Sequence, residues 1–135
     1  MLPSGLPDEV ADDESLTRFL TQSGHFNSVT AKPSAFLPSP RSRNTSVFRI
    51  GNEPATVRQV WAREASDSDR TLHGYAVFRV GGVRALSLEV VAEEPPPSHA
   101  NLENWPWLEG DPELQKARQK EIAMGIASKA ELVVL

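Results

Sequence analysis

The chain has 135 residues and a formal net charge of -4, and 39% of its residues are hydrophobic. This length suits one domain with a hydrophobic core, and the acidic balance argues against broad, phosphate-neutralising contact with nucleic acid. Because the chain contains no cysteine, disulfides, thiolate metal sites and cysteine nucleophiles are excluded.

No apolar run approaches the roughly 18 to 20 residues that span a bilayer, and the N-terminus lacks the basic and apolar regions of a secretory signal. The sequence therefore predicts a soluble, cytoplasmic protein without contact to a membrane. Residues 1–12 are rich in proline, glycine and acidic side chains and show no periodicity. They predict a flexible acidic arm in front of one domain that spans residues 13–135.

The first predicted element is a short amphipathic helix. In DDESLTRFLTQSG, residues 12–24, acidic residues precede Leu16, Phe19 and Leu20 at helical spacing, and a glycine ends the segment. Acidic caps, an apolar stripe and a closing glycine are typical start and stop signals of a helix.

Residues 25–44 are predicted to form a long loop, because they contain three prolines and several hydroxyl side chains. The expected anchors of this loop are Phe26, Phe36 and Leu37. Burying each of them could contribute roughly 1.5 to 3 kcal/mol against the entropy of ordering the segment.

A strand and a helix are predicted next. TSVFRI, residues 45–50, predicts a strand with Val47 and Arg49 on one face and Phe48 on the other. The following residues, 52–65, are expected to form a helix of about three turns. Its apolar stripe consists of Val57, Val60 and Trp61.

LHGYAVFRV, residues 72–80, alternates between apolar and polar side chains and predicts another strand. Two interpretations compete for the residues that follow. The two glycines after Val80 could form a hairpin turn, which would set Arg79 opposite Arg84 on the same face. A short helical turn through 82–86, followed by a strand at 88–92, avoids that repulsion and is favoured.

The chain is predicted to end with a helix and a strand. Asp111 as N-cap and Pro112 at the first helical position indicate a helix that runs to about Lys129, and Gly125 inside it indicates close approach of another element. AELVVL at the C-terminus predicts a strand. Together these elements predict a single compact α+β domain with a small central β-sheet, about three helices and two long proline-rich loops, 25–44 and 93–111.

The candidate catalytic residues are His99 and His25, one in each predicted loop. Each begins a His-x-Asn pattern, in which Asn27 or Asn101 could orient the imidazole or bind the same ligand. No metal site and no cofactor are expected, because the sequence lacks HExxH and comparable ligand patterns. It also lacks the G-x-S-x-G, P-loop and G-x-G-x-x-G motifs of hydrolases and nucleotide-binding proteins.

Basic residues in and after the first loop suggest an anion site. Guanidinium and imidazole groups hold phosphates or carboxylates and move protons at neutral pH. Arg49, Lys32 and Asn101 are the expected anion-binding residues, with His99 or His25 as general acid or base. In the alternative interpretation the cations are solvated and the histidines pack against the core.

Trp105 and Trp107 flank a proline in the second loop and are candidates for binding a partner protein. An aromatic pair on a stiff loop forms a contact surface at a low cost in entropy. The alternative is that the two indoles anchor the loop to the core, as large side chains do in a small domain.

Four segments resemble, in their order, a group of small uncharacterised bacterial proteins. The segments are HF at 25–26, AFLP at 35–38, SVFRI at 46–50 and PPPSHANLENWP at 95–106. The resemblance extends from about residue 16 and implies a bacterial, single-domain protein. It implies no activity and no catalytic residue.

Two hypotheses about function follow from the sequence. The first is a binding or accessory protein that contacts a partner protein through the face formed by loops 25–44 and 93–111. The second is a small enzyme that acts on a phosphate-containing or nucleotide-like substrate. The second hypothesis requires His25, Arg49 and His99 to share one pocket.

Overall fold

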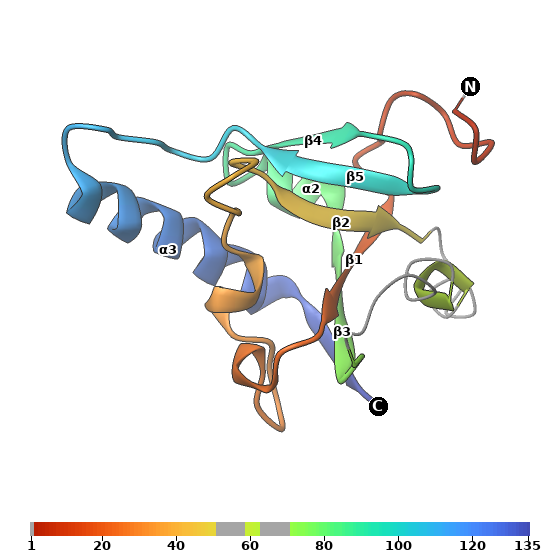
Figure 1. Ribbon diagram of the computed structural model, residues 1–135, viewed down its shortest axis with the longest axis horizontal. Coiled ribbons are helices and arrows are strands. Elements are labelled where there is room, and N and C mark those ends of the chain that lie inside the picture. The colour runs from red at the N-terminus through yellow and green to blue at the C-terminus, as the bar shows by residue number, and fades with distance from the viewer. Residues whose placement is uncertain (1, 51–58, 63–70) are drawn as a thin grey trace.

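The chain folds around a six-stranded antiparallel sheet in the order β4-β5-β2-β1-β3-β6 (Figure 1). This computed structural model describes residues 2–50, 59–62 and 71–135. The strands are β1 (Ser15–Leu20), β2 (Thr45–Arg49), β3 (Gly74–Arg79), β4 (Glu89–Ala92), β5 (His99–Glu103) and β6 (Glu131–Val134).

Two α-helices and a 3-10 turn pack around the core on one face of the sheet. The α-helices are α2 (Val80–Arg84) and α3 (Pro112–Lys129), and the 3-10 turns are η1 (Ser23–His25) and η2 (Pro33–Phe36). Residues 59–62 are also helical, and in Figure 1 they lie on the opposite side of the sheet from α3. The predicted α+β class, with a single domain around a central sheet, is confirmed.

The core lies between the sheet and α3. Paired residues of neighbouring strands lie on the same face of the sheet. Leu16 and Leu20 of β1 and Phe78 of β3 therefore all point toward α3. Phe36 of η2 is fully buried and stacks edge-on against Phe78, with ring centroids 5.5 Å apart. Ala123 and Ile126 of α3 complete this cluster. The other face carries the aromatic residues Phe19 and Phe48, with Trp61 packed against Phe19.

The helix predicted at residues 12–24 is wrong, because this segment contains β1. The apolar spacing of Leu16, Phe19 and Leu20 fits a helix, but the pairing of β1 with β2 and β3 buries both faces of the strand. Thr17, fully buried, donates its hydroxyl to the carbonyl of Ala76 at 3.1 Å. Sheet pairing overrides a local helical pattern of this length.

The second loop was also predicted with too little structure, since β5 lies inside the range 93–111. Ala100 and Leu102 point into the core, while His99 and Asn101 point to the other face. Polar residues such as asparagine are uncommon in strands, so the alternation of His99, Ala100, Asn101 and Leu102 was not recognised as that of a strand. Between two neighbours, β4 and β2, the strand is held by pairing on both sides.

In the first loop, Phe36 is confirmed as a buried anchor and Phe26 packs against the core, but Leu37 is 38% exposed. The prediction for Leu37 is therefore wrong. A turn of η2 places Ala35 and Phe36 inward, and the chain leaves the core immediately afterwards.

Later elements agree with the sequence. The hairpin considered at the two glycines after Val80 is wrong. The favoured alternative, a short helical turn followed by a strand, is confirmed, since α2 is followed by β4. Asp111 caps α3 by accepting the Leu114 N–H at 3.0 Å. A Cβ at Gly125 would lie 2.8 Å from Cδ2 of Leu86, which explains the glycine in the helix. Most of the helix predicted at 52–65 lies outside the described residues.

The N-terminal segment is attached to the sheet by Arg49, whose side chain is 1% exposed. Its guanidinium donates to the carboxylate of Glu14 at 2.8 and 3.0 Å and to the Pro7 carbonyl at 2.7 Å. A further bond of 3.3 Å reaches the Glu9 carbonyl. Val10 is buried beside this network. Residues of the predicted arm thus supply acceptors that a buried guanidinium requires.

Burial acts to raise the pKa of the Glu14 carboxyl, but hydrogen bonds from Arg49 and the Ala11 N–H, with the arginine charges, outweigh it. The result is a pKa below the ordinary value of 4.5. A carboxyl with a lowered pKa in the folded state stabilises the fold above its unfolded pKa. That contribution is lost as the pH falls through the folded pKa.

We expect Glu14→Gln to lower the free energy of unfolding by about 2 kcal/mol at pH 7, because it leaves the buried guanidinium without a charge partner. The difference from wild type should shrink as the pH falls below 4.5, where Glu14 itself becomes protonated. Urea unfolding between pH 3 and 7 measures this. The exposed Glu109, which pairs with Arg43 at 3.6 Å, provides the control Glu109→Gln. A pH-independent difference for Glu14→Gln would contradict the assignment.

Candidate functional site

His99 stands at the start of β5 on the face of the sheet opposite to α3, and its side chain is bonded at both ring nitrogens. Nδ1 lies 2.7 Å from the Glu93 carbonyl oxygen, and Nε2 lies 2.6 Å from Oγ of Ser46 in β2. A carbonyl can only accept, so Nδ1–H donates to Glu93. In the neutral ring, Nε2 then accepts the hydroxyl proton of Ser46.

This arrangement has the form of an activated serine. His99 is 8% exposed, whereas Ser46 is exposed. An imidazole whose tautomer is fixed by a third group, and whose other nitrogen contacts a hydroxyl, can remove the hydroxyl proton during attack on an electrophile. Here the group that orients the imidazole is a backbone carbonyl, which fixes geometry without adding a negative charge.

Asn101 lies directly opposite Ser46 across the β2–β5 pair and is 6% exposed. Its Nδ2 donates to Oε2 of Glu93 at 2.5 Å. Glu93 therefore receives a ring N–H at its carbonyl and an amide N–H at its carboxylate. Asn101 positions the residue that orients His99.

A pocket of about 260 Å³ opens beside Ser46, where β1 and β2 separate. Among the described residues the two strands pair only at Leu16 with Arg49 and at Thr17 with Phe48. Arg18 spans the separation and donates to the Ala35 carbonyl at 2.9 Å and to the Ser46 carbonyl at 2.8 Å. The described lining residues are Arg18, Phe19, Thr21, Gln22, His25, Ser46, Phe48 and Trp61.

Aromatic rings form one wall of this pocket. Phe19 stacks edge-on against Trp61, with ring centroids 5.0 Å apart, and is tilted by 41° against Phe48, with centroids 5.3 Å apart. Phe48 in turn lies 5.4 Å from the ring of His99. The row of rings connects the pocket wall to the buried imidazole.

His25 enters the pocket from the end of η1. Burial lowers the pKa of this imidazole, and the positive charge of Arg18 lowers it further. The ring is therefore neutral at pH 7 and can accept or relay a proton. His25 and Ser46 line the same pocket, whereas His99 bonds Ser46 from outside the described lining.

The other predicted site residues lie elsewhere. Arg49 points to the opposite face of β2 and is held by Glu14, so it does not share the pocket. Lys32 is exposed; its backbone N–H donates to the His25 carbonyl at 2.8 Å, but its side chain is not among the described lining of the pocket. Asn27 caps its own turn by accepting the N–H groups of Val29 and Thr30.

The two tryptophans pack at the far end of the sheet. Trp105 is 4% exposed in the core, and Trp107 packs against the core with the guanidinium of Arg43 4.9 Å from its ring centroid. Both indole N–H groups are buried without an acceptor in the described part of the chain. These positions favour the anchoring alternative for Trp105, which has little surface to offer a partner.

Ser46 and Arg18 were not among the sequence candidates. Alternation in TSVFRI already places Ser46 with Phe48, away from Val47, but a serine in a strand carries no motif. Its importance depends on His99, which is 53 positions away in the sequence. The signal that could have identified the pair was the alternation of HANL as a strand.

The sequence matches no protein-family profile, no curated protein and no solved structure. Within residues 2–50, 59–62 and 71–135, no three His, Asp or Glu side chains are grouped to hold a metal ion. In the same ranges no helix has the length and apolarity needed to cross a membrane. The site is therefore judged on its geometry.

Arg18→Gln should raise the pKa of His25 toward its ordinary value of 6.5, because it removes the neighbouring charge. The rise should be incomplete, since burial also lowers this pKa. NMR titration of the His25 ring protons measures the change, and Arg41→Gln, an exposed position outside the pocket lining, is the control. An unchanged His25 pKa in Arg18→Gln would show that the guanidinium does not act on the imidazole.

Proposed function

We propose that this protein binds a small phosphate monoester with one planar ring in the pocket beside Ser46. The observation that carries the proposal is the chemistry of the lining. Arg18 and His25 carry N–H groups, the Ser46 hydroxyl can turn from His99 toward a ligand oxygen, and none of the eight described lining residues is acidic. Such a set suits an anion, because guanidinium and hydroxyl groups hydrogen-bond phosphate oxygens.

The aromatic wall supports a ligand with a ring. Phe19 and Trp61 are both half-buried and both line the pocket, so part of each face is accessible. A planar ring can stack on such a surface and contribute roughly 1 to 3 kcal/mol. The volume of about 260 Å³ suits a nucleoside or aryl monophosphate better than a larger ligand. Binding of a partner protein by the loops 25–44 and 93–111 stays a prediction.

Ser46→Ala should weaken binding of 5′-AMP and phenyl phosphate about tenfold, because a hydroxyl that bonds a charged group is lost. Ser128→Ala, on the distant helix α3, is the matched control and should bind as wild type does. Isothermal titration calorimetry gives the affinities, and NMR shifts at His25 and Trp61 locate the ligand. Equal affinities for the two variants, or shifts confined to other residues, would refute the proposal.

A second candidate function is ester hydrolysis in the same pocket. The observation that favours it is the 2.6 Å contact from Ser46 Oγ to His99 Nε2, with Nδ1 held by Glu93. In this reaction Nε2 takes the hydroxyl proton as Oγ bonds to the electrophilic carbon or phosphorus. The bond to the leaving oxygen breaks, and that oxygen takes the proton from the imidazole. Water then releases the group from Ser46 by the same steps.

If hydrolysis occurs, Ser46→Ala and His99→Gln should each reduce the turnover of 4-nitrophenyl phosphate or acetate at least 100-fold, because nucleophile or base is missing. Mass spectrometry should detect a covalent group on Ser46 in wild type. Turnover that survives both substitutions, with no adduct on Ser46, would exclude this candidate and leave the binding proposal intact.

A further inference from the structure

A second cavity, of about 430 Å³, lies at the edge of β3 near the C-terminal end of α3. It exists because β6 pairs with β3 only from Gly74 to Val77. The last two residues of β3, Phe78 and Arg79, therefore have no strand beside them on that side. The end of α3 and the short helix α2 form the remaining walls.

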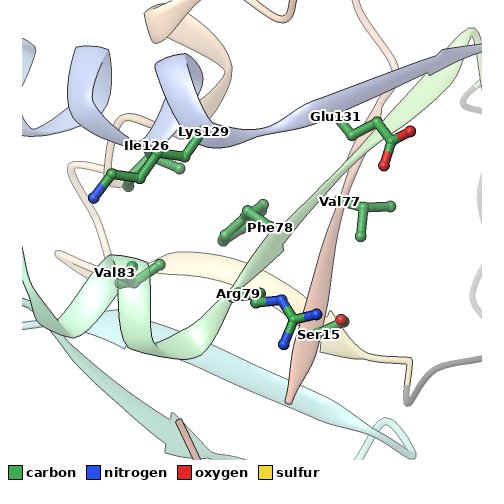
Figure 2. A pocket seen from close by; sticks show the side chains of 9 residues that line it. Ser15, Val77, Phe78, Arg79, Val83, Ile126, Lys129 and Glu131 are labelled. Carbon is green, nitrogen blue, oxygen red and sulfur yellow. The ribbon is translucent and has the colours of Figure 1, made fainter. Parts of the chain in front are cut away.

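The floor of this cavity is apolar. Phe78, Val83 and Ile126 come from three different elements and are each at most 4% exposed. Figure 2 shows Val83 and Ile126 on one side of Phe78 and Val77 on its other side. A hydrocarbon group on this floor would gain mainly by removing its own apolar surface from water, because the three side chains expose little of theirs.

The rim carries two cations. Arg79 and Lys129 are both exposed, and neither forms an ion pair or a side-chain hydrogen bond within the described residues. Ser15 is the cross-strand partner of Arg79, and Figure 2 shows the guanidinium beside the serine side chain. Neighbouring guanidinium and hydroxyl groups supply donors for both oxygens of a carboxylate.

The third charge at the rim is the carboxylate of Glu131. In Figure 2 it lies away from Lys129, at the end of the cavity near Val77. Two cations and one carboxylate leave a local charge of one positive unit. This balance favours a ligand with a single negative charge over a dianion.

We infer that this cavity binds a monocarboxylate with a medium-length apolar tail. The tail lies on Phe78, Val83 and Ile126, and the carboxylate is bound by Arg79 with Ser15. Lys129 adds attraction from the rim. Its stem passes Gly82, where an added Cβ would be 3.6 Å from Cδ of Lys129, so the glycine leaves the lysine room to lie against α2. The inference is independent of the pocket beside Ser46.

Octanoate is the probe, with 1-octanol and acetate as comparisons that lack the charge or the tail. Octanoate should bind the full-length protein saturably and shift the NMR signals of Phe78, Val83 and Ile126. Octanol and acetate should each bind at least tenfold more weakly, since each loses one of the two contributions. Shifts confined to other parts of the protein, equal affinity for octanol, or no saturable binding would overturn the inference.

Variants at the rim test the assignment of the carboxylate. Arg79→Gln should weaken octanoate about fivefold to tenfold, and Lys129→Gln by less, because only the guanidinium bonds the carboxylate directly. Lys120→Gln on the same helix is the matched control, since Lys120 is exposed and outside the cavity lining. Both rim side chains are exposed, so these variants should melt as wild type does. An equal effect of Lys120→Gln and Arg79→Gln would overturn the assignment.

Discussion

The alternation of side chains along β2 is the constraint on which both faces of the molecule depend. Val47 is fully buried in the core, and successive residues of a strand point to opposite faces. Placing Val47 inward therefore fixes Ser46 and Phe48 on the outer face and Arg49 inward beside Glu14. A slip of one residue would bury Ser46 and expose Val47, at the cost of a core side chain. The same burial that stabilises the sheet holds the Ser46 hydroxyl 2.6 Å from His99.

The pocket beside Ser46 is a consequence of how β1 and β2 separate. Where two strands part, their carbonyl groups lose ladder partners, and an unsatisfied buried carbonyl costs about 1 to 3 kcal/mol. Arg18 donates to the Ser46 carbonyl of β2, and its second bond, to the Ala35 carbonyl, connects β1 to η2. A guanidinium that satisfies the backbone in this way also stands in the pocket wall. The residue that bridges the opening is therefore also one of those that would contact an anion in the proposed function.

The sequence predicted those helices and strands whose start and stop signals are local. The prediction failed where pairing with neighbouring strands determines the secondary structure. Asp111 with Pro112 marked the start of α3, and Gly125 correctly indicated the close approach of Leu86. The stretch around Leu16 fits either a helix or a strand, and only the flanking strands select the second. The site was harder still. His25 and His99 were identified by residue type, but the hydroxyl that bonds His99 belongs to a strand residue without a motif. Arg49, chosen for its charge, is paired with Glu14.

The chain has more acidic than basic residues, and its cations differ in whether they bond a carboxylate. Arg49 and Arg84 bond carboxylates at 2.6 to 2.8 Å, and these pairs attach the N-terminal segment to the sheet and to α2. Leaving Arg79 and Lys129 unpaired among the described residues costs little stability, because exposed ion pairs contribute at most about 1 kcal/mol. What distinguishes these two from other surface cations is the apolar floor that they border. An apolar surface next to a cation is matched by a ligand that has both a hydrocarbon tail and a negative charge. In the inferred complex, the carboxylate of Glu131 at the same rim favours a ligand with a single negative charge.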